Sequence, residues 1–273
     1  RDSKIPDKII NEYNMKSKVS ADGFIYFQIK KAIYGLKQSG ALANQMLARI
    51  LKKEGYYQAK HTKGLWLHET KDLSFTLVVD DFGVRYVKKE DVGELVKLLE
   101  GTYPCKCDWS GSRYVGVNLD WDYKNRTLKT SMPGYVKKAL LQFQHERGTG
   151  RTQHSPSPYT PPNYGSKSQM TDLDLTAAMT NDEKKELQQA TGKFLYYGRA
   201  IDDTMLLALN CLSTRINNGT ERTTNALKQF LDYCHDNPDA IKMYVASDMI
   251  LFIDSDAAYL VKPMARSRAA GFL

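Results

Sequence analysis

A chain of 273 residues can form one large domain, or two to three small subdomains, with a sizeable core. Its hydrophobic content of 42% and charged content of 26% are ordinary for a globular protein, and no apolar run is long enough to span a membrane. The net charge is +8, and residues 1–60 alone hold twelve Lys and Arg against five Asp and Glu, which favours either a polyanion-binding surface or a merely solvated basic face.

The chain ends and the cysteines bear on the cellular compartment. The N-terminus has neither an initiator Met nor the apolar segment of a signal peptide, so we expect a protein that is not secreted and that is cut from a longer chain. Four cysteines, at positions 105, 107, 211 and 234, show no metal-ligand spacing beyond one Cys-x-Cys. Reduced thiols in a reducing compartment are therefore expected.

The first 60 residues predict a short helix or turn over 5–19, a strand over 23–29 and then one long helix. Ser39 is a suitable N-cap for that helix. Its apolar side chains fall on one stripe, which predicts a core-facing surface: Leu42, Met46, Leu47, Ile50 and Leu51. In the segment 31–40, at the start of this helix, Gly35 and Gly40 bracket Lys37 and Gln38. Backbone N–H groups there, together with Lys37 and Gln38, are suited to hold a phosphate or a base edge.

The segment 77–86 is the most informative stretch of the chain. An apolar run leads to Asp80 and Asp81, and a second β-prone run follows at once, which predicts a β-hairpin with both carboxylates at its tip. Two adjacent carboxylates repel each other, and a bound cation relieves that repulsion. Nucleotidyl transfer uses such a pair, because divalent ions flank the attacking and leaving oxygens. A simple solvated turn is the alternative, since Asp is a common turn residue.

Around this hairpin the first half of the chain predicts an α+β sheet with helices on one face. Strands are expected over 64–69, 73–79 and 84–87, and a helix over 90–99. A second hairpin pairs 113–121 with 126–132.

The second half is predicted to be mostly helical. Helices are expected over 133–145, 182–199, 202–217 and 221–236, and Thr180 with Glu183 forms a capping-box pattern. A polar loop with four prolines, residues 146–170, is expected to be long and flexible. A strand over 249–259 leads into acidic residues, and residues 266–273 begin a further element.

Five segments, in order, resemble blocks of the reverse transcriptase of copia-type retrotransposon polyproteins, and the resemblance covers nearly the whole chain. The segment 32–39 (Ala-Ile-Tyr-Gly-Leu-Lys-Gln-Ser) is similar to the family's Tyr-Gly-Leu-Lys-Gln block, and 78–81 (Val-Val-Asp-Asp) to its Tyr-Val-Asp-Asp turn. Residues 131–136 fall where the family enters its thumb. The segment 191–202 resembles the family's Gly-Ser-Leu-x-Tyr…Thr-Arg-Pro-Asp, and 255–257 (Ser-Asp-Ala) resembles the opening strand of its RNase H domain.

The resemblance implies an incomplete fingers–palm antiparallel sheet of a right-hand polymerase over 1–130 and a mostly helical thumb or connection over 131–247. The start of a truncated RNase H-like domain follows over 248–273. It implies RNA-directed DNA polymerisation with two Mg²⁺ ions, on a primer and an RNA or DNA template, using deoxynucleoside triphosphates. The compartment would be the cytoplasm, in a virus-like particle, or the nucleus, with no membrane partner.

The resemblance also assigns roles to individual residues. Asp80 and Asp81 would be the catalytic metal ligands. Nucleotide or template would be contacted by the block at Tyr34, Gly35, Lys37 and Gln38, in which Tyr34 and Gly35 are also expected to fix the loop. Asp256 would be the first catalytic aspartate of RNase H.

Two departures from the family pattern shape the functional hypothesis. Val78 stands in place of the family's tyrosine, and no Asp in a matching strand context precedes the Tyr-Gly-Leu-Lys-Gln block, so the third metal-binding aspartate is expected upstream of Arg1. We therefore predict that this piece alone is nearly inactive. A non-catalytic nucleic-acid-binding remnant of a degraded or host-captured element is the rival, and a structural α+β domain without a ligand is the third interpretation.

Overall fold

The structure is a computed structural model that describes residues 5–28, 36–159, 174–248, 250–262 and 266–272. It is a mixed α+β protein whose sheets are antiparallel. The chain divides into two compact units, residues 1–105 and 106–273, which are described separately below. This division differs from the expected boundary at 130–131, because residues 127–131 pair with residues 241–245 of the second unit.

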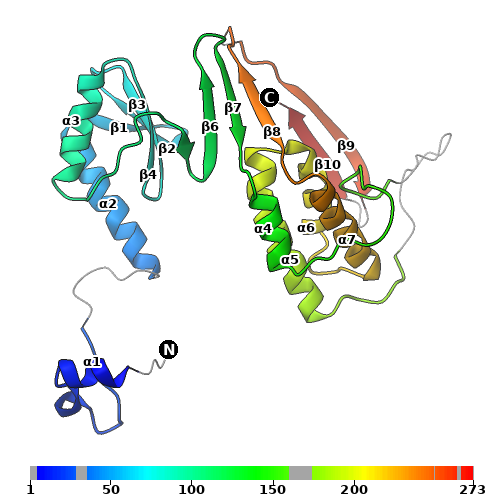
Figure 1. Cartoon of the computed structure of the whole chain (residues 1–273), viewed down its shortest axis with the longest axis horizontal. Helices are drawn as coiled ribbons and strands as arrows, with labels where there is room; N and C mark the ends of the chain where they lie inside the picture. Colours follow the sequence, from blue (N-terminus) through cyan, green and yellow to red (C-terminus); the bar gives the residue numbers. More distant parts are fainter. Residues whose placement is uncertain (1–4, 29–35, 160–173, 249, 263–265, 273) are drawn as a thin grey trace. The chain divides into compact units, whose positions relative to one another are not determined.

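The first unit contains a four-stranded antiparallel meander in the order β1-β2-β3-β4. Helices α2 and α3 lie on one side of this sheet (Figure 1). The predicted meander and the helix after it are confirmed, and β1 is a strand that the sequence pattern did not predict. The elements are β1 (Tyr56–Ala59), β2 (Thr62–His68), β3 (Leu73–Val78), β4 (Asp81–Tyr86), α2 (Lys37–Lys53) and α3 (Lys89–Glu100).

One face of this sheet carries the core. Trp66 pairs with Phe75 across β2 and β3, and Phe75 pairs with Val84 across β3 and β4, so that all three side chains lie on the same face. The rings of Trp66 and Phe75 are stacked with centroids 6.0 Å apart. Helices α2 and α3 complete this core with apolar side chains, among them Leu51, Val92, Leu95 and Leu99. In the described residues of this unit, no helix covers the opposite face.

Residues before the sheet depart from the sequence predictions. The first helix is confirmed as α1 (Asp7–Glu12) with a 3₁₀ turn η1 (Met15–Lys18), but residues 24–28 form no strand, because no described strand lies beside them to accept their hydrogen bonds. Ser39 is not an N-cap: α2 begins two residues earlier, after Leu36. The predicted apolar stripe is only partly buried, since Leu42 and Met46 are exposed.

The second unit is built on another antiparallel meander, β5-β6-β7-β8. The predicted hairpin is confirmed over 117–122 and 127–131, and its turn lies at the end of the strands away from the helices (Figure 1). Arg113 and Tyr114, expected in its first strand, form a separate short strand that pairs with β6. Strand β8 was not predicted; it pairs with β7 more than 100 residues earlier in the chain, with Leu128 opposite Tyr244. The strands are β5 (Arg113–Tyr114), β6 (Val117–Asp122), β7 (Thr127–Ser131) and β8 (Ile241–Val245).

Helices pack against one end of this second sheet. Phe194, Tyr197 and Phe230 are fully buried among them, and the rings of Phe194 and Phe230 meet edge to face at 5.3 Å. The expected capping box forms, with the Thr180 hydroxyl accepting from the Glu183 N–H. The predicted 202–217 helix is shorter, because a 3₁₀ turn opens it. The elements are α4 (Tyr135–Gln142), α5 (Asn181–Ala200), η2 (Asp203–Met205), α6 (Leu206–Ser213) and α7 (Glu221–Asp236).

Two further features complete this unit. A two-stranded antiparallel hairpin is formed by β9 (Asp254–Lys262) and β10 (Arg266–Phe272). The predicted strand therefore begins later than residue 249, and the following element is its partner. None of the helices in the described ranges combines the length and apolarity needed to cross a lipid bilayer.

The first part of the proline-rich loop is attached to α7. The Arg147 guanidinium donates to both carboxylate oxygens of Asp236 at 3.0–3.1 Å, and the Gln153 N–H donates to the same carboxylate at 2.7 Å. The Gln229 side chain then donates to the Ser155 carbonyl at 3.2 Å. The expected flexible loop is thus hydrogen-bonded to a helix over its described beginning; its remainder, 160–170, lies outside the described residues.

This attachment predicts a pH-dependent stability. The Arg147 guanidinium, followed by the Gln153 N–H and His235, holds the pKa of Asp236 well below its ordinary 3.8. Because the folded-state pKa is lowered, the stabilisation is present above about pH 4 and is lost as the pH falls through the folded pKa. We expect Asp236→Asn to lower the melting temperature at pH 7 and to resemble the wild type in strong acid. Thermal unfolding from pH 7 to pH 2 measures this.

The control is Glu186→Gln, which removes an exposed carboxylate of α5 that has no partner among the described residues. It should follow the wild-type curve at every pH. Equal melting temperatures for Asp236→Asn and the wild type at pH 7 would contradict a stabilising role of the Arg147–Asp236 pair.

Candidate active site at the turn between β3 and β4

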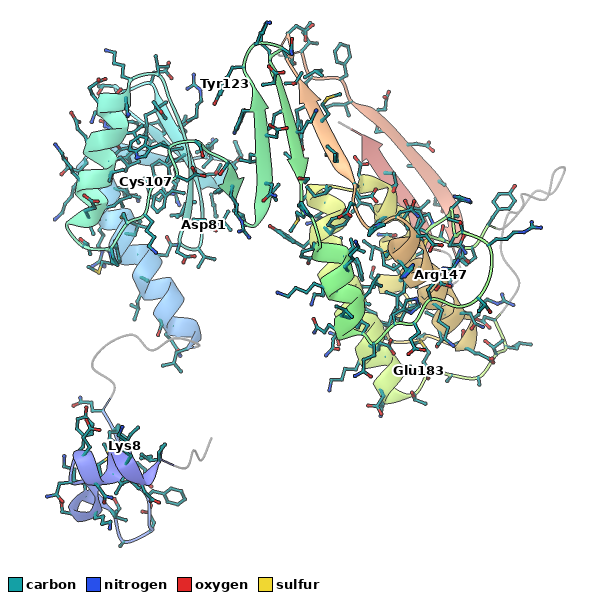
Figure 2. The ribbon with its side chains drawn as sticks, in the orientation of Figure 1. Lys8, Asp81, Cys107, Tyr123, Arg147 and Glu183 are labelled. Atoms are coloured by element: carbon teal, nitrogen blue, oxygen red, sulfur yellow. The ribbon has the colours of Figure 1, made fainter. Side chains whose placement is uncertain are left out.

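The aspartates lie on a tight turn whose position is fixed by the packing of β3 and β4. Leu77 pairs with Phe82, and the Phe82 ring lies 5.1 Å from the buried ring of Phe75. The next pair outward is Val78 with Asp81, which leaves Val79 and Asp80 as the two central turn residues. We call residues 78–81 the aspartate turn; Figure 2 labels Asp81 at this end of the hairpin.

The aspartate turn differs in one respect from the sequence prediction. Only Asp80 is at the tip, whereas Asp81 is the first residue of β4 and lies directly opposite Val78. Residues opposite each other in an antiparallel pair share a face, and the neighbouring pair Leu77–Phe82 faces the core. Asp81 therefore lies on the sheet face that no described helix covers. The alternation of apolar residues over 73–84 is the signal that could have given this register.

Val79 adopts a backbone conformation that is unfavourable for its side chain. Its φ is +59°, and the residue is 90% exposed. Positive φ at the first central residue is typical of a type II′ turn, where glycine is preferred, and a β-branched residue is strained there. Such a residue persists where the surrounding structure fixes it, and here the pairs Val78–Asp81 and Leu77–Phe82 adjoin the turn.

Both carboxylates of the aspartate turn are exposed, and neither has a hydrogen-bond or ion-pair partner among the described residues. Their oxygens are the ligand type that Mg²⁺ prefers, so the pair fits a hard divalent cation. Within the described ranges, no cluster of three or more His, Cys, Asp or Glu is arranged to hold a metal. The two aspartates alone therefore leave most of the six positions of an octahedral ion to other ligands.

The remaining residues of the expected site are placed only in part. Tyr34 and Gly35 lie outside the described residues, and Lys37 is the first residue of α2. Gln38 is exposed in the first turn of α2 and has no hydrogen bond to the aspartate turn. The structure thus brings Asp80 and Asp81 together and does not join Gln38 to them.

Basic side chains follow along α2. Arg49, Lys52 and Lys53 are exposed, and none of them forms an ion pair with a described residue. Their charge remains uncompensated and is available to a polyanion.

Asp256 lies in a separate place, in β9 of the second unit. It is exposed, pairs with Ala270 of β10, and its carboxylate accepts from the Ala257 N–H at 2.8 Å. Asp254 is two residues earlier on the same strand and so points to the same face. Small residues of β10, Ala270 and Gly271, line a shallow hollow beside both aspartates.

Comparisons with known proteins do not assign this site. No family model matches the chain, and no solved structure matches it.

The strained turn gives a stability prediction. Replacing Val79 with Gly removes the steric conflict at positive φ, and we expect a gain of about 1 kcal/mol in the free energy of unfolding after the entropic cost of glycine. The matched control is Val78→Gly, one residue earlier in an ordinary strand position, which should lose about 0.5–1 kcal/mol. Hydrogen exchange of the β3 and β4 amides measures both, and a loss with Val79→Gly would contradict the strain.

Proposed function

We propose that this chain is the reverse-transcriptase region of a copia-type retrotransposon polyprotein, a template-directed DNA polymerase. The observation that carries the proposal is the aspartate turn: two adjacent, exposed and unpartnered carboxylates on a β-hairpin whose sheet has helices on one face only, within the described residues of this unit. The opposite face, to which Asp81 belongs, is free for a primer and template in the described part of this unit. The ordered sequence blocks support the same assignment.

The proposed reaction joins a primer to a deoxynucleoside triphosphate. The primer 3′-oxygen forms a bond to the α-phosphorus, the bond from that phosphorus to the bridging oxygen breaks, and pyrophosphate leaves. The proton of the 3′-hydroxyl passes to solvent. Asp80 and Asp81 would hold Mg²⁺, which when bound neutralises charge on the attacking and leaving oxygens. Lys37 and Gln38 would orient the nucleotide or the template, because they can donate to phosphate or to a base edge.

A third carboxylate is part of this proposal. Two aspartates on one turn hold Mg²⁺ loosely, so that alignment of the reacting oxygens needs another ligand. In β4 the edge away from β3 has no partner strand among the described residues. A strand added there would run beside Asp81, and it is where an additional aspartate would reach the same ions.

A catalytic role for Asp80 and Asp81 predicts a sharp effect of a single substitution. We expect primer extension to require a segment that supplies the third carboxylate, so that residues 1–273 alone give none and the chain with its preceding coding sequence does. In that longer protein, Asp80→Asn should reduce extension by at least about 100-fold, because a metal ligand is removed. Incorporation of a labelled nucleotide on a primed RNA template measures this.

The control for the extension assay is Asp72→Asn, which removes an exposed carboxylate of the same unit that pairs with Arg85. It should extend primers normally. Extension that survives Asp80→Asn would refute the assignment, and extension by residues 1–273 alone would refute the need for a further carboxylate.

The second candidate function is nucleic-acid binding without catalysis. It is favoured by the uncompensated charge of Arg49, Lys52 and Lys53 on α2 and by the two-carboxylate composition of the aspartate turn in the described part of the chain. An element degraded or captured by its host could retain this activity alone. It differs from the first candidate in that extension would be absent from every longer form of the chain.

Both candidates predict binding to primer–template duplex that weakens steeply with salt. Each neutralised phosphate releases counterions, which gives a slope of about −0.9 per phosphate in a plot of log affinity against log salt. We expect Arg49→Ala, Lys52→Ala and Lys53→Ala together to make that slope shallower by about one unit for each phosphate that the variant no longer neutralises. Fluorescence anisotropy over a series of KCl concentrations measures it, and affinity that is independent of salt would contradict both candidates.

Asp256 extends the proposal to a second region. Its place in β9, on one face with Asp254, suits the first metal-binding strand of an RNase H domain. Among the described residues, no third His, Cys, Asp or Glu joins these two aspartates in a group that could hold a metal.

A further inference from the structure

The second sheet carries a group of exposed aromatic side chains that the proposed polymerase site does not use. Trp121 of β6 and Tyr123, at the following turn, stack in parallel with ring centroids 5.9 Å apart and planes 9° apart. Trp121 is 42% exposed, and Tyr123 is 80% exposed. Exposed apolar side chains that adjoin one another on a surface are typical of a binding site, in contrast to single exposed rings.

The strand register adds a third ring to the same face. Trp121 is opposite Leu128, and Leu128 is opposite Tyr244 of β8, so the three side chains form one row across the sheet. Tyr244 is 48% exposed. Trp121 and Tyr244 are two strands apart, about 10 Å, which leaves the half-buried Leu128 as an apolar floor between them. We call Trp121, Tyr123 and Tyr244 the aromatic face.

Two rings of the aromatic face have contacts that orient them. The Trp121 indole N–H donates to the Gly111 carbonyl at 2.9 Å, which fixes the ring plane. On β8, the ammonium of Lys242 lies 5.9 Å from the centre of the Tyr244 ring. Figure 1 shows that the β6–β7 turn lies away from helices α4 to α7, and Figure 2 labels Tyr123 at that turn, so these helices leave this end of the sheet uncovered.

The charge on this end of the sheet is divided between its two faces. Strand alternation places Asp120 and Asp122 on the opposite face from Trp121, and Asp120 is opposite Lys129 there. The Asp122 carboxylate accepts hydrogen bonds from the Asn125 backbone and side-chain N–H groups at 2.9 and 2.7 Å. Its negative charge is therefore stabilised within the turn. Lys124 and Arg126, in the same turn as Tyr123, form no ion pair within the described part of the chain.

We propose that the aromatic face binds single-stranded nucleic acid, with bases stacked on Trp121, Tyr123 and Tyr244 and phosphates near Lys124 and Arg126. Aromatic rings accept any base on their faces, and nearby cations follow the backbone, which is the general means of sequence-independent single-strand binding. A protein partner would need complementary apolar shape, whereas exposed rings beside cations without an ion-pair partner in the described residues suit a chain of bases and phosphates. The inference uses residues apart from the aspartate turn and stands whether or not the chain polymerises DNA.

The test is binding of a fluorescein-labelled single strand, about 20 nucleotides long and of mixed sequence, to the 273-residue chain by anisotropy. Tyr123→Ala and Tyr244→Ala should each weaken binding about tenfold, since each removes one stacking ring. Tyr123→Phe and Tyr244→Phe keep the ring and should bind as the wild type does. Lys124→Ala and Arg126→Ala should weaken binding and reduce the salt slope by about 0.7 each, whereas the two ring deletions should leave that slope unchanged.

The matched control is Met243→Ala, which removes an exposed side chain next to Tyr244 on the opposite face of β8. It should not alter binding. Unchanged affinity in both ring deletions, or an equal weakening in Met243→Ala, would overturn the proposal. Circular dichroism of each variant distinguishes a local effect on binding from unfolding, and photo-cross-linking to 5-iodouracil should map to peptides that contain Trp121, Tyr123 or Tyr244.

Single-strand binding and primer extension can be tested independently of each other. Asp80→Asn should bind the single strand normally, because the aspartate turn is not part of the aromatic face. Suppose that Asp80→Asn abolishes single-strand binding while Tyr123→Ala and Tyr244→Ala leave the affinity unchanged. The single strand would then bind at the aspartate turn, and the proposal for the aromatic face would be refuted.

Discussion

Each unit of this protein depends on the burial of one face of an antiparallel sheet. Side chains alternate along a strand, so the register that turns one set of side chains toward the helices turns the other set toward the opposite face. In the first unit, Trp66 and Phe75 are buried beneath α2 and α3, and the register that buries them sets Asp81 on the uncovered face. In the second unit the helices bury only one end of the sheet, and the rings of Trp121 and Tyr244 lie beyond them.

Strong local patterns made much of this fold predictable. Helices α3, α5 and α7 follow from apolar periodicity and, for α5, from the Thr180–Glu183 capping box, which forms as expected. The hairpin of β3 and β4 follows from two β-prone runs around a short polar turn. These features are decided within a few residues of sequence, where pattern and propensity agree.

Other features depend on distant partners and were missed or misplaced. Strand β8 exists because it pairs with β7, which is far away in the chain, and its five residues carry too weak a pattern on their own. The reverse holds for residues 24–28, whose aromatic composition favours a strand but which have no described strand beside them. The candidate site shows the same division: the Asp80–Asp81 pair was evident from sequence, whereas the strained turn at Val79 was not. The aromatic face could not be foreseen, since it requires the register of β8.

Hydrogen bonds hold the chain to α7 on both sides of residues 160–173. Before residues 160–173, the Gln153 N–H donates a hydrogen bond to Asp236, the last residue of α7. After them, the Asp174 carboxylate accepts a hydrogen bond from the hydroxyl of Thr220, the N-cap of the same helix. Both flanking segments are therefore hydrogen-bonded to one helix of 16 residues, about 24 Å long. A protease cut between them would yield two fragments that remain associated, and the same two pieces expressed separately should reassemble around α7.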